Sequence, residues 1–453
     1  MQYFSTRGQT APHSFSAAVA AGLAPDGGLF LPESLPDISG HLVEWEKLSY
    51  PDLAASFFTL FAPEISPADW QAMTRQAYAP FSHPDVAPLV NLDCRTWVLE
   101  LFHGPTLAFK DFALQLLGLL YKRQVEQTGH KLTVLGATSG DTGSAAIHGC
   151  RGQDGITMFI LYPEGRVAPL QERQMACTGA SNVFAIPVPG TFDDAQRIVK
   201  ETFADAAFAR SVNLSAVNSI NIARVLAQCV YYIYAWLRLP VSARDGVEFV
   251  VPTGNFGNVL AGWLAQKMGL PAGGFRVATN QNDILYRFFT TGIYEQGNVQ
   301  PSHAPSMDIQ AASNFERYLY FLLGGDPAKT REIMEHVKTT GRADLSALPS
   351  TGMTASRMDD AGIAAAIGRF WTEFGYVADP HTACAFTGLA QDRASVILAT
   401  ASPAKFPEIV AQATGIHPLD PALEALKTLP LKTWPLAASV PAVESFILEK
   451  LKG

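Results

Sequence analysis

Residues 103–114 read HGPTLAFKDFAL and set one lysine, Lys110, in an apolar segment that leads from a Gly-Pro turn into a helical pattern. Because an ammonium group is costly to bury, a lysine beside Phe109, Phe112 and Leu114 needs an explanation. Loss of water lowers the pKa of such an amine and frees it to attack a carbonyl carbon. A lysine at a helix start that extends its charge into water is the alternative, and this segment alone favours it. The choice between the two depends on the rest of the chain.

Two later segments share one design, in which a buried strand runs into a Gly-rich turn and a helix follows at once. Residues 132–143 read LTVLGATSGDTG, and residues 247–258 read VEFVVPTGNFGN. Glycine lets the backbone approach a ligand, and the free N–H groups and dipole of a helix start favour an anion. Either turn by itself is also explained as a tight connection. Neither turn matches the P-loop pattern or the dinucleotide fingerprint, so ATP and NAD are disfavoured.

From Lys131 onward, short β-rich runs alternate with longer helical patterns. Such alternation predicts an α/β fold with parallel sheets and helices on both faces. The expected strands are 132–135, 156–162, 183–188, 247–251, 275–278 and 395–399, and the expected helices are 112–121, 222–237, 259–268 and 363–374. The preceding 1–95 segment carries aromatic residues in helical patterns with several Pro breaks, which indicates an N-terminal cap domain. Past Pro418 we expect a tail with one amphipathic helix at 443–451.

Composition and charge exclude several classes of function. The chain has 453 residues, 48% of them hydrophobic and 16% charged, which is enough for two or more domains. The net charge is -8 and Lys and Arg form no run, so we expect no nucleic-acid partner. The longest uncharged apolar pattern, 225–237, is too short to cross a membrane, so we expect no membrane partner.

The cysteines and the amino-terminal segment bear on the compartment. The five cysteines form no C-x-x-C pair, which favours small buried side chains in a reducing compartment over disulfides or a metal site. Residues 15–24 resemble a signal-peptide core, but only Arg7 precedes them as a basic residue and a PDGG turn follows. We therefore expect a cytoplasmic protein without a bound metal.

Four motifs occur in the order found in threonine synthases, and together they make the chain similar to that family. They are HGPTLAFKD at 103–111, TSGDTG at 138–143, GNFGN at 254–258 and TASPAKF at 400–406. The segments YFSTRG at 3–8 and LAPDGGLF at 23–30 resemble the longer bacterial and fungal branch of the family. The resemblance implies the fold type II architecture of pyridoxal-phosphate (PLP) enzymes, shared with the tryptophan synthase β subunit. Two α/β domains would enclose a cofactor cleft beside an N-terminal domain.

The resemblance also implies domain limits and roles for individual residues. The expected domains are an N-terminal domain at 1–95, a large PLP-binding domain at 96–130 and 215–420, a small domain at 131–214 and a tail at 421–453. Lys110 would form the Schiff base with PLP, and Thr400 would face the pyridine nitrogen. The cofactor phosphate would be held by Gly254, Asn255, Phe256, Gly257 and Asn258. The substrate carboxylate would meet Thr138, Ser139, Gly140, Thr142 and Gly143.

Two positions depart from the pattern of many relatives. Asp141 stands where many carry Asn, which would face O3' of the cofactor; an amide can donate to a phenolate, whereas a carboxylate can only accept. Ser402 stands where close relatives often carry His, so Ser402 is a second candidate for the pyridine nitrogen.

The implied reaction converts O-phospho-L-homoserine and water to L-threonine and phosphate. The freed amine of Lys110 would remove the Cα proton, phosphate would leave from Cγ, and water would add at Cβ. The substrate phosphate needs a second anion site, for which Ser219, Asn221 and Arg224 at a predicted helix start are candidates. A capped helix with a surface arginine explains these three equally well. The protein would be a monomer or a homodimer.

Two alternatives to this reaction remain. Another PLP lyase of the same fold, such as a threonine or serine dehydratase or a phospholyase, would release a different set of products. A non-catalytic relative that binds PLP or an amino acid as a regulator is a further possibility, although an intact Lys110 argues against it.

Overall fold

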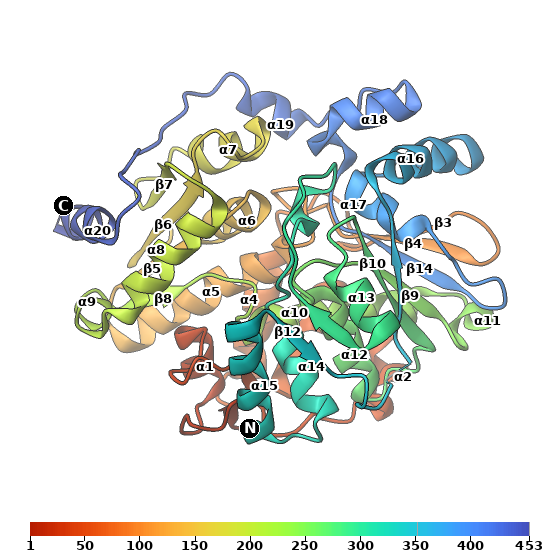
Figure 1. Ribbon diagram of the computed structural model, residues 1–453, viewed down its shortest axis with the longest axis horizontal. Helices are drawn as coiled ribbons and strands as arrows, with labels where there is room; N and C mark the ends of the chain where they lie inside the picture. Colours follow the sequence, from red (N-terminus) through yellow and green to blue (C-terminus); the bar gives the residue numbers. More distant parts are fainter. Residues whose placement is uncertain (351, 453) are drawn as a thin grey trace.

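A computed structural model describes residues 1–350 and 352–452, and two sheets form its framework (Figure 1). The larger sheet has six strands in the order β13-β10-β9-β14-β4-β3, and the smaller has four in the order β7-β6-β5-β8. Neighbouring strands are parallel except for β3 beside β4. The large sheet comprises β3 (Leu89–Asn91), β4 (Thr96–Glu100), β9 (Glu248–Pro252), β10 (Gly274–Thr279), β13 (Thr354–Arg357) and β14 (Ser395–Ala399). The small sheet comprises β5 (Leu132–Ala137), β6 (Ile156–Pro163), β7 (Val183–Val188) and β8 (Leu214–Ala216).

Helices connect the strands and cover the sheets. Those of the small-sheet region are α6 (Asp141–Cys150), α7 (Pro169–Ala176), α8 (Phe192–Ala204) and α9 (Ala206–Ser211). Those of the large-sheet region are α10 (Ile222–Arg238), α11 (Val241–Arg244), α12 (Gly257–Lys267), α13 (Ile284–Thr291), α14 (Phe315–Leu322), α15 (Pro327–Thr340), α16 (Asp360–Phe374), α17 (Pro380–Ala383) and α18 (Pro407–Thr414). The long helix α5 (Asp111–Thr128) packs against both α6 and α10. A separate antiparallel pair joins β11 (Ile293–Glu295) to β12 (Arg342–Asp344).

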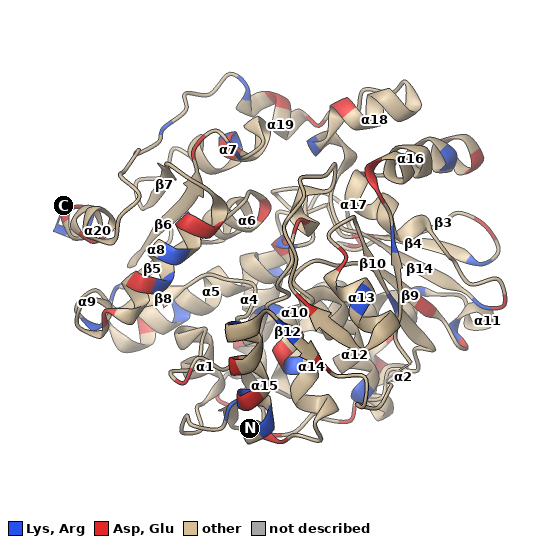
Figure 2. Ribbon diagram, viewed as in Figure 1, with Lys and Arg blue, Asp and Glu red and all other residues tan. Residues whose placement is uncertain are grey.

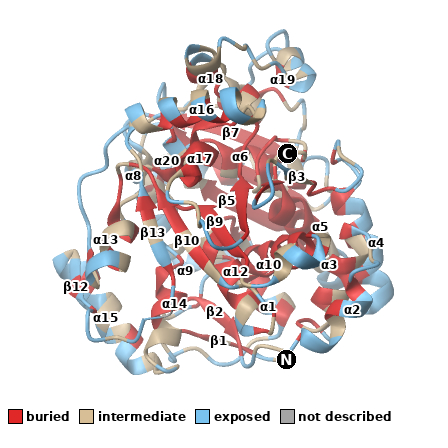
Figure 3. Ribbon diagram, turned by 90° about the vertical axis from the view of Figure 1, so that its right-hand side faces the viewer, coloured by how far each residue is buried: buried red, intermediate tan, exposed pale blue. Residues whose placement is uncertain are grey.

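The central strands are buried on both faces, as their uninterrupted apolar sequences predict. In β9, Phe249 and Val251 join the largest hydrophobic cluster, whereas Val250 between them joins a second cluster with α16 and α17. In β6, Met158 and Ile160 likewise face the largest cluster and Phe159 faces a third. One apolar core therefore lies against one face of each sheet, and Figure 3 shows buried residues along the strands of both.

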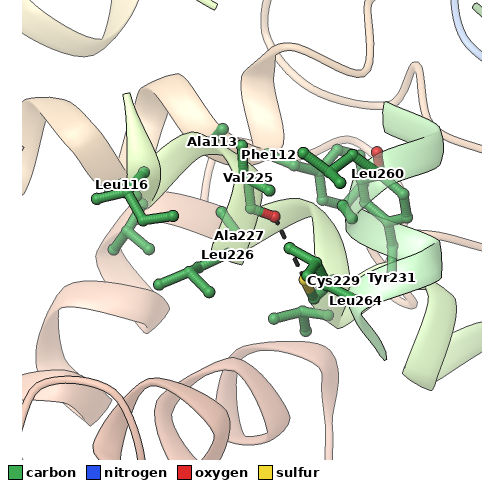
Figure 4. Close-up of a cluster of buried hydrophobic side chains, with 14 of the residues drawn as sticks. Phe112, Ala113, Leu116, Val225, Leu226, Ala227, Cys229, Tyr231, Leu260 and Leu264 are labelled. Atoms are coloured by element: carbon green, nitrogen blue, oxygen red, sulfur yellow. Dashed lines mark hydrogen bonds between the residues drawn. The ribbon is translucent and has the colours of Figure 1, made fainter. Parts of the chain in front are cut away.

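The amino-terminal segment shares this central core. It contains β1 (Tyr3–Ser5), α1 (Phe15–Ala21), β2 (Phe30–Pro32), α2 (Leu42–Trp45), α3 (Tyr50–Thr59) and α4 (Pro67–Tyr78). Tyr50 contacts the rings of Tyr78, Phe112 and Tyr234 on α4, α5 and α10. The close-up in Figure 4 shows α5, α10 and α12 side chains packed together around Phe112 and Leu260. The segment therefore packs into the same hydrophobic core as the two sheets, mainly through its aromatic side chains.

The expected strands and crossover helices are confirmed within three residues of their predicted ends, except that α5 continues to Thr128, seven residues beyond its predicted end. The tail also contains the expected helix, α20 (Val440–Lys452), preceded by α19 (Pro421–Leu426). Phe446 of α20 contacts Phe159 and Phe184 of the small sheet, so the tail covers the outer face of that sheet.

Lys and Arg are interspersed with Asp and Glu over the ribbon (Figure 2). Within the described ranges, no helix is both long and apolar enough to span a membrane.

Candidate active site

Lys110 lies where several strands end at their carboxyl edges, the usual ligand position in α/β sheets. Its side chain is 13% exposed, and its Nζ lies 3.3 Å from Oδ2 of Asp141 and 3.5 Å from Oγ of Ser306. Burial lowers the pKa of Lys110, the nearby Asp141 carboxylate raises it, and the net result is a pKa below the ordinary value for lysine. A largely buried amine with a lowered pKa is suited to act as a nucleophile. The geometry therefore favours the reactive-amine interpretation over the surface one.

A strained turn delivers Lys110 to this position. Leu107 has a φ of 60°, a left-handed conformation that is uncommon for a residue with a side chain. A Cβ at Gly104 would lie 2.5 Å from the Asp111 carboxylate, so only glycine fits there. That carboxylate accepts hydrogen bonds from the N–H and hydroxyl of Thr106, and burial raises its pKa to about 6. The HGPT turn is thus folded around Asp111, directly after Lys110.

Asp141, at the start of α6, carries a carboxylate that accepts hydrogen bonds from four side chains of the site. Its Oδ1 accepts from Lys405 Nζ at 2.5 Å and Gln171 Nε2 at 2.7 Å, and its Oδ2 faces Lys110 and the Ser306 hydroxyl. Burial alone would raise the pKa of Asp141, but the Lys110 and Lys405 ammonium groups hold it well below its usual range. Asp141 is therefore an ionised acceptor held between two lysines.

The rest of the TSGDTG turn divides into residues that shape it and residues that line it. The Thr138 hydroxyl accepts from the N–H groups of Gly140 and Gly143 at 3.0 and 2.9 Å, so it shapes the turn. Ser139 is exposed and Thr142 is half-buried, which leaves both side chains accessible. The N-cap residue of α6, Gly140, provides no side chain to cap the helix. The free N–H groups at this helix start are available to an anion.

The GNFGN turn has the corresponding geometry at the end of β9. Phe256 takes a left-handed φ of 64°, packs its ring against Phe289, Phe315 and Tyr318, and leaves α12 without a side-chain cap. Asn258 Oδ1 accepts from the hydroxyls of Tyr231 and Tyr232. Its Nδ2 atom is buried with no hydrogen-bond partner among the described residues. An unpaired donor beside an uncapped helix start fits a bound anion.

Arg224 provides a second unpaired donor group. Its residue is 2% exposed, and the buried Nε and Nη1 atoms have no hydrogen-bond partner among residues 1–350 and 352–452. Burial lowers the pKa of this guanidinium to about 10. A buried arginine without a partner is costly, so a ligand anion is the expected complement.

The other two residues of the predicted second anion site differ in availability. Asn221 is fully buried and engaged, because its Oδ1 caps α10 at Ala223 N–H and its Nδ2 donates to the Val19 carbonyl. Ser219 is half-buried, and its carbonyl accepts from Asn314 Nδ2. The geometry gives Asn221 a structural role and leaves Ser219 as the most accessible of the three residues.

Thr400 and Ser402 both follow β14 and are both buried. The Thr400 carbonyl accepts from Phe109 N–H at 2.9 Å, which fixes it next to Lys110. The Ser402 hydroxyl accepts from Ala404 N–H and caps the 3-10 helix Pro403–Lys405. No hydrogen bond of the Thr400 hydroxyl is found within the described part of the chain, so that group is the freer of the two.

Four residues of the site were not singled out from the sequence: Gln171, Ser306, His381 and Lys405. Ser306 links the start of α6 to α17, because its hydroxyl donates to Asp141 while its N–H donates to His381 Nε2. Lys405 lies within TASPAKF, where a lysine between Ala404 and Phe406 gives the same sequence signal as Lys110. The other three lie in segments without a distinctive pattern. The described residues contain no cluster of ligands suited to a metal ion, and all five cysteines are free.

Comparison with known proteins gives consistent matches along the chain. The model of pyridoxal-phosphate dependent enzymes matches residues 84–398, that of the threonine synthase N terminus matches 2–78, and that of the threonine synthase C-terminal region matches 381–447. Threonine synthase of Pseudomonas aeruginosa is 44% identical over 91% of this chain and 90% of that protein. The PLP-bound threonine synthase structure from Brucella melitensis superposes with a TM-score of 0.94 at 42% identity, covering 100% of both chains. The yeast threonine synthase structure gives 0.91 at 38% identity, covering 100% of this chain and 99% of that one.

Proposed function

The chain belongs to the threonine synthase family of PLP-dependent enzymes, and from this premise we propose that it converts O-phospho-L-homoserine and water to L-threonine and phosphate at Lys110. The observation that carries the substrate assignment is Arg224, a buried guanidinium with unpaired donors in a site that already has two anion turns. Those two turns suffice for a cofactor phosphate and a substrate carboxylate. A third anion site requires a substrate with a second anionic group.

The residues present fit the cofactor of this family. We propose that the α12 start and the unpaired Asn258 Nδ2 receive the cofactor phosphate, together with the backbone of Gly254, Asn255, Phe256 and Gly257. We assign the pyridine nitrogen to Thr400, because the Ser402 hydroxyl is used as a helix cap. Bound at Lys110, PLP supplies an electron sink for the bond-breaking steps at the substrate carbons.

The chain's own residues would then bind the substrate and move its protons. The Lys110 amine, once freed, is positioned to take the proton from Cα. The α6 start, with Ser139, Gly140, Thr142 and Gly143, would hold the substrate carboxylate, in a turn kept in shape by Thr138. Arg224 and Ser219 would hold the substrate phosphate until it leaves from Cγ, and water would add at Cβ.

The same proposal covers the organisation and setting of the enzyme. We assign the small sheet to a domain at 131–214 and the large sheet to a domain at 96–130 and 215–420, with 1–95 as an N-terminal domain and 421–453 as a tail. The α12 turn then belongs to the large domain and the α6 turn to the small one. The enzyme would act in the cytoplasm as a monomer or a homodimer.

The reaction products test this assignment. Purified protein incubated with O-phospho-L-homoserine and PLP should release threonine and phosphate in equal amounts, as measured by amino-acid analysis and a phosphate assay. Threonine or serine as the substrate should give little 2-oxo acid or ammonia. Efficient release of a 2-oxo acid and ammonia would instead indicate a dehydratase, and no turnover of either substrate would favour a non-catalytic relative.

Replacing Gly257 by valine should weaken PLP binding at least about tenfold. A Cβ at this position would lie 3.2 Å from Asn314 Nδ2 and 3.9 Å from Gln228 Oε1, at the helix start that we assign to the phosphate. Titration of PLP into the apoprotein measures the effect. Gly274→Val is the matched control, because nothing lies within 4 Å of a Cβ there. Equal PLP affinity for Gly257→Val and wild type would mean that this turn is only a connection.

A further inference from the structure

Lys405 is a second buried lysine at the same carboxylate as Lys110. Its side chain is 0% exposed, and its Nζ donates to Asp141 Oδ1 at 2.5 Å and to the Thr106 carbonyl at 3.0 Å. A lysine this deeply buried is retained only where its charge is paired. Asp141 is the only carboxylate within salt-bridge distance of Lys405 in the described residues.

The two lysines use different oxygens of Asp141. Lys405 is 2.5 Å from Oδ1, whereas Lys110 is 3.3 Å from Oδ2. Gln171 adds a donor to Oδ1, and the Ser306 hydroxyl adds one to Oδ2. The carboxylate is thus held on both sides, and the pair with Lys405 is the closer of the two.

The two lysines also differ in what happens to their charge. Attachment of an aldehyde cofactor to Lys110 forms one C=N bond and releases one water, and the ammonium must first lose a proton to solvent. During that step Lys110 is a neutral amine and no longer pairs with Asp141. Without another cation, a buried carboxylate would be left uncompensated, which is strongly unfavourable.

We propose that Lys405 is a positioning residue that serves as the permanent counter-ion of Asp141, so that Lys110 can lose its proton and react. This inference rests on the assignment of Lys110 as the cofactor lysine. Lys405 acts through Asp141, because its ammonium neutralises the carboxylate whether or not Lys110 is charged. Asp141 and Lys405 together are then a neutral pair.

The direction of the electrostatic effects agrees with this role. Burial and the Lys405 charge both lower the pKa of Lys110, whereas Asp141 raises it. Removing Lys405 would leave Asp141 paired with Lys110 alone and so keep Lys110 protonated. Removing Asp141 as well would free the amine again.

A double-mutant cycle on the apoprotein tests the proposal through the rate of covalent PLP capture, read from absorbance and from borohydride-trapped adduct at Lys110. Lys405→Met should slow capture by about 10- to 100-fold, the size expected when a buried charge loses its partner. Asp141→Asn should capture PLP faster than wild type, because it removes the carboxylate that keeps Lys110 protonated. The double variant Lys405→Met/Asp141→Asn should recover to within about threefold of Asp141→Asn.

The rescue separates a charge role from a packing role, since a merely structural lysine would not be compensated by Asp141→Asn. Should Lys405→Met fail to fold, Asp141→Asn and the double variant still decide: the proposal requires the double variant to fold and to capture PLP at the rate of Asp141→Asn. Independent, multiplying effects of the two substitutions would overturn it. Capture is measured without substrate, so a failure to make threonine would not affect this result. Absence of any adduct at Lys110 in wild type would instead overturn the cofactor assignment.

Discussion

Lys110→Ala is expected to lower turnover of O-phospho-L-homoserine by at least about 1,000-fold, because one substitution removes both the cofactor attachment and the base for the Cα proton. Phosphate release under saturating substrate and PLP measures this loss. Folding should be unaffected, because Asp141 keeps its ion pair with Lys405 when the Lys110 ammonium is removed.

The control for this substitution is Lys427→Ala, which changes an exposed lysine that directly follows α19 and pairs with Glu424 of that helix. That variant should turn over like wild type. If Lys110→Ala kept more than about a tenth of the activity, another lysine would have to carry the cofactor.

Arg224→Leu should raise the KM for O-phospho-L-homoserine by roughly 10- to 100-fold, the equivalent of ~1.5–3 kcal/mol for a lost charge-assisted contact. A guanidinium offers two parallel donors to a phosphate oxygen pair, which leucine cannot replace. The affinity for PLP should barely change. Because the unpaired charge is costly to bury, the free variant should unfold at the same or a higher temperature than wild type.

Arg238→Leu is the matched control for Arg224→Leu. Arg238 lies on the same helix, 14 residues or ~21 Å further along, where it donates to the carbonyls of Glu46 and Leu48. The KM of the Arg238→Leu variant for O-phospho-L-homoserine should equal that of wild type. Phosphate-free homoserine should inhibit wild type and Arg224→Leu equally weakly. A normal KM for Arg224→Leu would mean that the substrate phosphate is bound elsewhere, either by the 138–143 turn or by the amino-terminal segment.

The sequence predicted the local architecture well because local signals determine it. Apolar runs of four to seven residues predicted β5, β6, β7, β9, β10 and β14, and glycines after two of them marked the turns that start α6 and α12. These turns do lie at the carboxyl ends of strands around Lys110. The tail helix α20 was also visible, from its alternating apolar face.

Contacts between distant segments were not predictable in the same way. Lys405 and Gln171 reach Asp141 from segments 264 and 30 residues away, and nothing in their own sequence context states the partner. For Asn221 the sequence predicted a contact that the structure does not leave free. Its residue type suggested a ligand contact, whereas its side-chain amide donates to the carbonyl of Val19 in α1. The aromatic residues of 1–95 indicated helices, but their burial against α5 and α10 depends on the fold as a whole.

Borohydride trapping followed by peptide mapping tests the central claim that Lys110 is the cofactor lysine. The purified enzyme, reconstituted with PLP, is reduced and digested, and the modified peptide is sequenced by mass spectrometry. The structure makes the choice sharp, because Lys405 is the other buried lysine on the same carboxylate, with its Nζ 2.5 Å from Asp141. The account predicts a single reduced adduct on Lys110 within HGPTLAFKDFAL. An adduct on Lys405 or on any other lysine would contradict it.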